Sequence, residues 1–398
     1  MSDRSSFYQL IALPVVVAGR DRYVITRKFL DGITYFADHW PGNVTVFMEP
    51  IATAYGNLDY IEVSGAELPF TIKPLCFDDP KLRQEILHGD LVHWGPHYKL
   101  HDLGSILQKV GISNVYCTEY SLKTRHQIIM TDATSPPRKC RRLIWETNQE
   151  RLIRKNIKRV PAVECNGTPT YNAYRNLANQ ILLYFDTRTS KDLLISGNAL
   201  QDKSRRLLDN NKPLQLTFSG RLTEMKGVKD LIPVARDLRA QGIPYELHIY
   251  GDGNLKAWLE KEIKAHALEG RVKVHGNVDF KNVLVPALQQ ETDLFVCCHL
   301  QGDPSCTYLE TSACGVPIVG YLNEAFEGLL HHANAGWGVP LGQPEKIAQT
   351  IATLATNRNA IAQKGRTAAE FASAHTFEET FSRRVSFYEE VLYAHRRS

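Results

Sequence analysis

Apolar residues recur along the second half of the chain in two alternating spacings. Short, nearly continuous apolar runs predict the strands 213–220, 245–251, 271–276, 293–299, 316–321 and 336–341. Between them lie segments with helical spacing at 228–238, 254–267, 279–290, 307–314 and 344–355. One face of the first of these helices carries Val228, Leu231, Ile232, Ala235 and Leu238. Apolar strands that alternate with amphipathic helices predict a parallel sheet covered on both faces.

The first half shows a looser version of this pattern. It predicts a helix at 24–38 and strands at 8–18, 43–49, 90–95, 114–120 and 126–130. A polar stretch with turn residues, 187–213, separates the halves, and we place the domain junction there. The expected fold class is α/β, with two Rossmann-like, doubly wound parallel-sheet domains.

The last segment predicts one more amphipathic helix, 376–398. Thr376 followed by Glu379 has the capping-box spacing that starts a helix. The expected buried face consists of Phe377, Phe381, Val385, Tyr388 and Leu392.

Composition and charge are ordinary for a globular protein and exclude few functions. The 398 residues exceed one typical core, so about two to three domains are expected. Hydrophobic residues make up 43% and charged residues 23%, and a net charge of +4 is too weak to predict nucleic-acid binding. The eight cysteines have no regular spacing, which predicts neither a disulfide framework nor a zinc site.

The longest early apolar run, 10–18, is far shorter than the ~20 residues of a membrane-spanning helix. It also resembles the core of a weak signal peptide, but the residues before it carry only Arg4 against Asp3. We therefore favour a first buried strand, and with no other candidate span we expect a cytoplasmic protein.

The segment 216–232, LTFSGRLTEMKGVKDLI, places two cations at the edge of the predicted sheet. Gly220 and Arg221 end a strand, where open parallel sheets bind ligands. Lys226 starts the next helix, where free N–H groups and the helix dipole favour an anion. Two cations this close suit a diphosphate, and we expect neither in the core. The alternative is a solvated helix start, since the spacing matches neither a Walker A loop nor the dinucleotide fingerprint.

Two further features lie at strand ends of the same sheet. Gly251 and Gly253 form a tight turn that lets backbone approach a ligand closely. Glu310 lies in the helix after the loop 300–306, where a carboxylate can accept hydrogen bonds from ribose hydroxyls. The alternative for Glu310 is a glutamate that faces solvent.

The motifs GRLTEMKG, IYGDG and YLETSACGVPIVG, followed by the closing helix, resemble glycosyltransferase family 4 (glycosyltransferase group 1). The resemblance covers residues 214–345 and the last helix. It implies the GT-B fold, with an acceptor domain at 1–190 completed by 376–398 and a donor domain at 191–375. It also implies that Arg221 and Lys226 bind the donor diphosphate and are the catalytic residues, and that Glu310 binds the ribose. The donor-binding set then comprises Gly220, Arg221, Lys226, Gly251, Gly253, Asp303, Ser305, Cys306, Thr307 and Glu310.

The sequence departs from the family pattern at two places. Gly302 stands where the first glutamate of the family's E-x7-E motif would contact the donor sugar, and the nearest carboxylate is Asp303. Asp303 either replaces that glutamate or, before Pro304, acts only as a helix N-cap. Of the glycine pair often found after the first strand, only Gly19 is present.

The resemblance implies a retaining transfer of a hexose-type sugar from a nucleoside-diphosphate sugar, which is a substrate, so no cofactor is expected. No D-x-D motif occurs in the sequence, so we expect no metal and charge stabilisation by Arg221 and Lys226. The missing glutamate keeps a catalytically inactive nucleotide-sugar-binding subunit open as an alternative. A sugar-nucleotide epimerase or a phosphorylase of the same fold is a further alternative. A phosphorylase would usually carry a pyridoxal-lysine site, and none is identifiable in the sequence.

Residues at predicted strand ends of the first half are candidates for the cleft and the acceptor: Gly19, His93, His97, Glu119 and Tyr120. A histidine at such a place is more often structural. Residues 138–159 carry nine Lys or Arg against Glu146 and Glu150. A solvated helix face is the usual explanation, and contact with an anionic membrane, at its inner face, or with a phosphorylated acceptor is the functional one.

Overall fold

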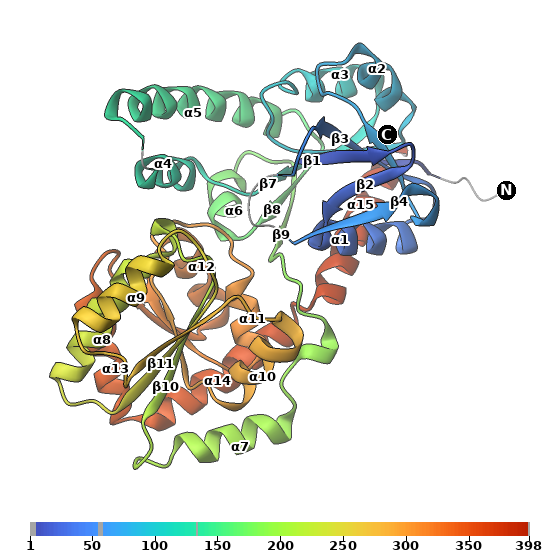
Figure 1. The fold of residues 1–398 in the computed structure, drawn as a ribbon. Helices are drawn as coiled ribbons and strands as arrows, with labels where there is room; N and C mark the ends of the chain where they lie inside the picture. The colour runs from blue at the N-terminus through green and yellow to red at the C-terminus, as the bar shows by residue number, and fades with distance from the viewer. Residues whose placement is uncertain (1–4, 55–58, 133, 397–398) are drawn as a thin grey trace.

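The computed structural model describes residues 5–54, 59–132 and 134–396. Within these residues the chain forms two α/β halves, each built on its own sheet (Figure 1). The first sheet has nine strands and the second has six. The predicted class of two sheet domains is therefore confirmed.

The first sheet mixes parallel and antiparallel strands. Its strands are β1 (Phe7–Gly19), β2 (Arg22–Thr26), β3 (Val44–Ile51), β4 (Tyr60–Ser64), β5 (Thr71–Pro74), β6 (Leu91–Trp94), β7 (Ser113–Thr118), β8 (Ala162–Asn166) and β9 (Gln180–Tyr184). They run in the order β4-β2-β1-β6-β7-β8-β9, and β3 pairs with β1 and β5. β1 is parallel to β3 and β6, but its outer end forms an antiparallel hairpin with β2.

The first predicted strand is confirmed, but it is not buried along its whole length. Phe7, Leu10 and Val15 are buried, whereas Leu13 is 37% and Val17 is 46% exposed. Beyond Gln9 the strand no longer pairs with β6 and continues beside β3 and β2.

The helices of the first half are α1 (Arg27–His39), α2 (Pro80–Glu85), α3 (Leu103–Val110), α4 (Leu122–Thr131), α5 (Pro136–Ile157) and α6 (Thr168–Tyr174). The strand predicted at 126–130 is wrong, because these residues belong to α4. Ser121 caps this helix, and its Oγ accepts a hydrogen bond from the Thr124 N–H at 3.1 Å. This cap, upstream of the apolar run, decides the local structure.

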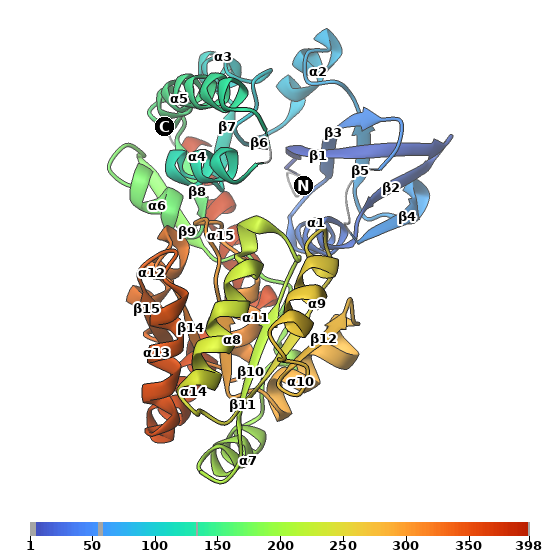
Figure 2. The ribbon, with the colours of Figure 1, turned by 60° about the vertical axis from the view of Figure 1, so that its left-hand side comes forward.

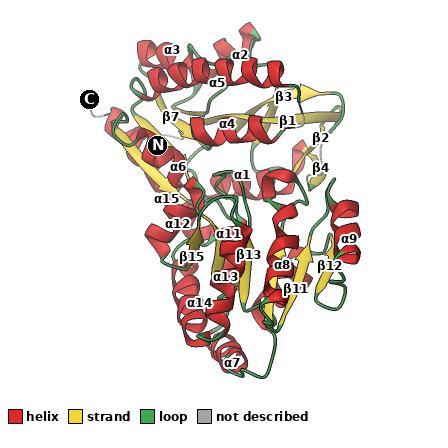
Figure 3. Ribbon diagram, turned by 90° about the vertical axis from the view of Figure 1, so that its left-hand side faces the viewer, coloured by secondary structure: helices red, strands yellow, loops and turns green. Residues whose placement is uncertain are grey.

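The second sheet is parallel throughout and follows the predicted strands closely. Its strands are β10 (Leu214–Ser219), β11 (Tyr245–Tyr250), β12 (Val272–Gly276), β13 (Leu294–Cys297), β14 (Ile318–Tyr321) and β15 (Gly336–Val339), in the order β12-β11-β10-β13-β14-β15. The helices are α7 (Gly197–Leu207), α8 (Leu231–Ala240), α9 (Lys256–Ala265), α10 (Val285–Gln290), α11 (Thr307–Ala313), α12 (Glu324–Ala333), α13 (Pro344–Ala355) and α14 (Arg358–Ser373). They cover both faces of the strands (Figures 2 and 3). The predicted apolar stripe is fully buried at Val228, Leu231, Ile232, Ala235 and Leu238.

The junction predicted at 187–213 is not a simple linker, since it contains α7. This helix packs against α10 and α14 of the second half. Its buried Lys203 donates from Nζ to the carbonyl oxygens of Leu288 at 2.6 Å and Cys314 at 3.0 Å. Helical periodicity would require an apolar residue at this position, but the lysine fills it by donating to two buried carbonyl oxygens. The spacing of apolar residues therefore did not predict α7.

The last helix, α15 (Phe377–Arg396), returns to the first half and packs against α1, β7 and β9. Its predicted face is confirmed, since Phe381, Val385, Tyr388 and Leu392 are buried and Phe377 packs against them. The two chain segments that pass between the halves touch each other, because the Phe377 N–H donates to the Thr189 carbonyl oxygen at 2.8 Å. Among the described residues, no helix is both long enough and apolar enough to span a bilayer.

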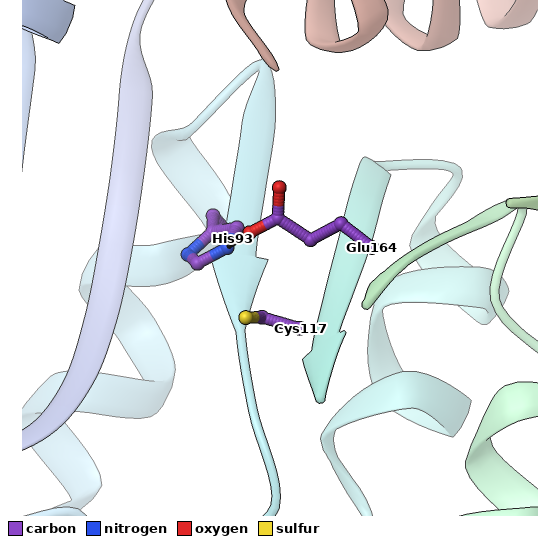
Figure 4. Close-up of side chains that lie close together, drawn as sticks. All are labelled: His93, Cys117 and Glu164. Atoms are coloured by element: carbon purple, nitrogen blue, oxygen red, sulfur yellow. Dashed lines mark hydrogen bonds and ion pairs between the residues drawn. The ribbon is translucent and has the colours of Figure 1, made fainter. Parts of the chain in front are cut away.

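A fully buried carboxylate, Glu164 of β8, joins α15 to the first sheet. Figure 4 shows Glu164 beside His93. Arg384 contacts both its oxygens, at 2.8 and 3.1 Å, and His93 Nε2 of β6 lies 2.7 Å from Oε1. Burial alone would raise the pKa of Glu164, but the charge of Arg384 and the contacts with His93 outweigh it and hold that pKa far below its usual value. The carboxylate is therefore charged inside the protein.

Replacing Arg384 with methionine should destabilise the protein by about 3–5 kcal/mol, because it leaves the Glu164 charge buried without its partner. Urea denaturation gives the change. The double variant Glu164→Gln/Arg384→Met should recover much of the loss. Arg383→Met, on the exposed side of the same helix, is the matched control. Equal midpoints for Arg384→Met and Arg383→Met would contradict this role.

Candidate active site

The carboxyl ends of the second sheet's strands open onto a cleft shared with the first half. The second half contributes Ser219, Gly220, Arg221, Tyr250, Gly251, Asp252, Gly253, Thr307 and Glu310. The first half contributes His93, His97, Glu119 and Tyr120 together with residues 9–13 of β1. Most of the predicted site residues therefore come together from both halves.

The two cations of the basic pair have different environments. Arg221 follows β10 after Gly220, is exposed and lines the cleft, and among the described residues it has no ion-pair partner. Lys226 lies in the 3₁₀ turn Glu224–Lys226 and is buried, contrary to our expectation. Its Nζ lies 3.1 Å from the Asp303 carboxylate. Arg221 alone of the pair is therefore free to meet a ligand as the cleft stands.

The glycines of the GDG turn are required by the protein's own packing. A Cβ at Gly251 would lie 2.0 Å from the Gly220 carbonyl oxygen, and one at Gly253 would lie 2.5 Å from the Leu222 carbonyl oxygen. Gly251 also has φ of +130°. These glycines bring the turn against the Gly220–Arg221 loop, which fixes the wall of the cleft behind Arg221.

Asp303 is not a helix N-cap, because α11 begins only at Thr307. Its carboxylate instead accepts from Lys226 and, at 3.1 Å, from the side-chain amide of Gln301. Burial raises the pKa of Asp303, but the positive charge of Lys226 outweighs it and leaves a net lowering. The carboxylate thus holds the strand-end lysine and is not free in the open cleft.

Gly302 is clamped by the first half. Its N–H donates to Gln127 Oε1 at 3.1 Å, and its carbonyl accepts from Thr124 Oγ1 at 3.2 Å, both on α4. A Cβ at this position would lie 3.0 Å from both Glu324 Cβ and Thr124 Oγ1. A glutamate side chain here would therefore require both Thr124 of α4 and Glu324 of α12 to shift, which gives a physical reason for the glycine.

Ser305 and Cys306 border the cleft less directly than predicted. Ser305 lines a small separate pocket with Pro304 and Tyr308. The Cys306 sulfur accepts from Lys28 Nζ of α1 at 3.0 Å, and the same lysine pairs with Asp186. Thr307 does line the cleft. The loop 300–306 is thus linked to the first half through Cys306 as well as Gly302.

Glu310 is 6% exposed and forms an ion pair with Arg188, whose Nε lies 2.7 Å from Oε1. It is not the solvent-facing glutamate of the alternative explanation. Sequence reasoning missed Arg188, because a single arginine in a polar segment has no motif around it.

The predicted first-half residues divide into two groups. Glu119 and Tyr120 are exposed to the cleft, whereas His93 lines it from a buried position beside Glu164. Gly19 is not among the residues that line the cleft, because it lies at the far end of β1 beside β2. The ligand atoms of His93, Cys117 and Glu164 lie within 4.8 Å of one another (Figure 4). Arg384 already supplies the positive charge there, so we assign no metal to this group.

Although its side chain is exposed to the cleft, protein groups surround Glu119 and reduce its hydration. This desolvation, followed by the nearby carboxylate of Asp186, raises the pKa of Glu119 from about 4.5 to about 7. The nearby charge of Glu119, together with burial, in turn raises the pKa of Tyr120. The cleft therefore gains a negative charge as the pH rises through neutrality.

Because its pKa is raised in the folded protein, ionisation of Glu119 should make the free energy of unfolding depend on pH. The folded state retains a proton that the unfolded chain releases near pH 4.5, so the parent loses stability relative to Glu119→Gln as the pH rises from about 4.5 to about 7. Thermal denaturation should give similar melting temperatures below this window and a higher one for the variant above it. Glu260→Gln, at an exposed position of α9, is the control. A constant difference across pH 4–8 would refute the assignment.

Residues 201–371 match the family model described as Glycosyl transferases group 1. The putative colanic acid biosynthesis glycosyltransferase WcaL of Escherichia coli (strain K12) is 29% identical over 147 residues, which cover 35% of this chain and 36% of that protein. The amylovoran biosynthesis glycosyltransferase AmsK of Erwinia amylovora is 30% identical over 154 residues, 36% of either protein. The chain thus spans about a third of the length of these relatives.

Several solved structures match almost the whole chain. Anabaena HepE in complex with UDP has a TM-score of 0.66 at 16% identity, over 96% of this chain and 98% of that one. Sucrose-phosphate synthase from Thermosynechococcus elongatus has a TM-score of 0.64 at 16% identity, over 98% and 100%. The match of the second half to the family model and the likeness of the fold lead to one conclusion. The second half of the chain, residues 201–371, belongs to the group 1 glycosyltransferases, and the whole chain has the GT-B fold.

Proposed function

We propose that the protein is a retaining glycosyltransferase that moves a hexose-type sugar from a nucleoside-diphosphate sugar to an acceptor. The observation that carries the proposal is Arg221, exposed and without an ion-pair partner among the described residues, at the carboxyl end of β10. A cation held at this edge of a parallel sheet is placed to stabilise a diphosphate. Glu310, on the neighbouring helix, is the proposed ribose ligand.

The comparisons support a donor and an acceptor class. HepE is described in complexes with UDP and with UDP-glucose, which favours a nucleoside-diphosphate hexose here. WcaL and AmsK are described by the biosynthesis of colanic acid and amylovoran. We therefore propose a glycan acceptor in polysaccharide assembly, in preference to a lipid or a small molecule.

In the proposed reaction the bond between the anomeric carbon and the diphosphate oxygen breaks, and a bond to the acceptor hydroxyl oxygen forms on the same face. The acceptor proton passes to the departing diphosphate, so no protein base is required. Arg221 offsets the charge that develops on that diphosphate. Lys226 reaches the same region only if it exchanges its contact with Asp303 for one with the ligand.

An inactive nucleotide-sugar-binding subunit is the second candidate. The observation in its favour is that Gly302 lacks a carboxylate and that Asp303 is committed to Lys226. Consumption of the donor separates the two, because an inactive subunit binds the nucleotide sugar without turning it over. We further propose 1–190 with 376–398 as the acceptor domain and 191–375 as the donor domain.

We also propose that α5 contacts an anionic membrane surface. Together with α4 it forms an arm at the outer edge of the first half (Figure 1). Exposed apolar side chains on the arm, Met130, Ile144 and Trp145, lie among its exposed arginines. Apolar groups that insert between lipids, flanked by cations, suit the interface of an anionic bilayer.

Arg221→Ala should lower turnover by ~10²-fold or more, since it removes a preorganised cation from the leaving group. Its melting temperature should not change, because the side chain is exposed. Arg236→Ala, at an exposed position of α8, is the matched control. Donor consumption is followed with and without EDTA, and activity should survive the chelator. Parental turnover in Arg221→Ala would reject the proposed role.

Binding to vesicles tests the membrane contact. Binding to phosphatidylglycerol-containing vesicles should fall as salt rises, since exposed charges are screened within about 10 Å at ~0.1 M salt. Arg138→Gln/Arg141→Gln and Ile144→Ser/Trp145→Ser should each weaken binding. Lys261→Gln/Lys264→Gln, on the exposed side of α9, should not. Equal binding to neutral and anionic vesicles, or binding to neither, would return α5 to a solvated helix.

A further inference from the structure

Arg188 lies where the chain passes from the first half to the second, between β9 and the 3₁₀ turn Lys191–Leu193. It lines the same cleft as Arg221 and Glu310. Nothing in the sequence motifs or in the proposed chemistry uses it.

The backbone around Arg188 is held firmly. Thr187 and Thr189 are buried on either side, and the Thr189 N–H donates to Thr187 Oγ1 at 3.0 Å. The Thr189 carbonyl accepts from the first residue of α15. Arg188 therefore projects into the cleft from a fixed segment, which reduces the entropy lost when it contacts a ligand.

Two contacts orient the guanidinium group. Its Nε donates to Glu310. Its central carbon lies 3.9 Å from the ring centroid of Phe280, the first residue of the π-helical segment Phe280–Leu284 that follows β12. The Arg188 side chain is 46% exposed, whereas that of Glu310 is 6% exposed. One surface of the guanidinium group is thus covered by the ring, and part of the rest faces the cleft.

The chemistry of this arrangement suits a nucleoside. A guanidinium group is planar, delocalised and weakly hydrated, and nucleobases stack on such planes. Its positive charge also offsets that of Glu310, because an unpaired carboxylate would repel a nearby diphosphate. A ribose then meets a carboxylate that is already oriented.

We propose that Arg188 is a donor-binding residue that positions Glu310 for the ribose and offers its exposed surface to the nucleobase. The inference rests on the proposed function, since it needs a nucleotide donor. The competing explanation is that Arg188 occupies the ribose position and must be displaced. The two make opposite predictions for affinity.

Calorimetric titration with UDP, GDP and ADP, and separately with inorganic pyrophosphate, tests the proposal. For the diphosphate that the parent binds, Arg188→Ala should weaken binding at least tenfold. Arg188→Lys should also weaken it, because the charge remains but the plane is lost. Phe280→Leu should have a smaller effect in the same direction. Binding of pyrophosphate should change less than binding of the nucleotide, because it has neither base nor ribose.

Lys191→Ala removes a cation from the same segment outside the cleft lining and should bind like the parent. Melting temperatures show whether each variant folds. If Arg188→Ala does not fold, Arg188→Gln replaces it. The glutamine keeps a hydrogen-bond donor for Glu310 and should also weaken nucleotide binding. Unchanged or tighter nucleotide binding by a folded Arg188 variant overturns the inference and leaves the proposed function standing. A parent that binds none of the nucleoside diphosphates overturns both.

Discussion

The charge of Glu164, buried between β8 and α15, constrains the whole first half. Arg384 neutralises it and His93 completes its contacts, so β6, β8 and the last helix must keep one arrangement. Phe381 and Arg384 of that helix also line the cleft. Because an unpaired charge in this position is costly, a change that loosens α15 also disturbs one wall of the site. The chemistry of the cleft therefore depends on a helix more than 200 positions away in sequence from the carboxylate it meets.

The cleft holds most of its charges in pairs made between distant segments. Lys226 is paired with Asp303, Arg188 with Glu310 and Lys28 with Asp186. Each pair joins a different loop to its neighbour, and the clamp of α4 on Gly302 adds an uncharged link of the same kind. A diphosphate bound as proposed would enter a network in which these positive groups already have partners, and it would have to compete with Asp303 for Lys226. Arg221 requires no such exchange.

The sequence predicted the second half well because its strands and helices bury apolar residues at regular spacing. The stripe from Val228 to Leu238 is an example, and all five of its members lie in the core. Predictions failed where a polar contact replaced an apolar one. In α7 the buried Lys203 donates to two carbonyl oxygens, so a lysine stands where the helical pattern would need an apolar residue. Ser121 caps α4 at its start, where the apolar run alone suggested a strand. Asp303 and Arg188 could not be assigned in advance, since their partners lie far away in the chain and only the fold brings them together.

The two segments that pass between the halves run side by side, joined by the hydrogen bond from Phe377 to Thr189 and by the ion pair between Lys191 and Glu379. Two adjacent connections act as one pivot. Rotation of one half about this pivot stretches neither segment, whereas a sliding movement would shear the bonds between them. Opening of the cleft should therefore follow a single swinging axis, and the contacts of Thr124 and Gln127 on α4 with Gly302 are among those that must separate.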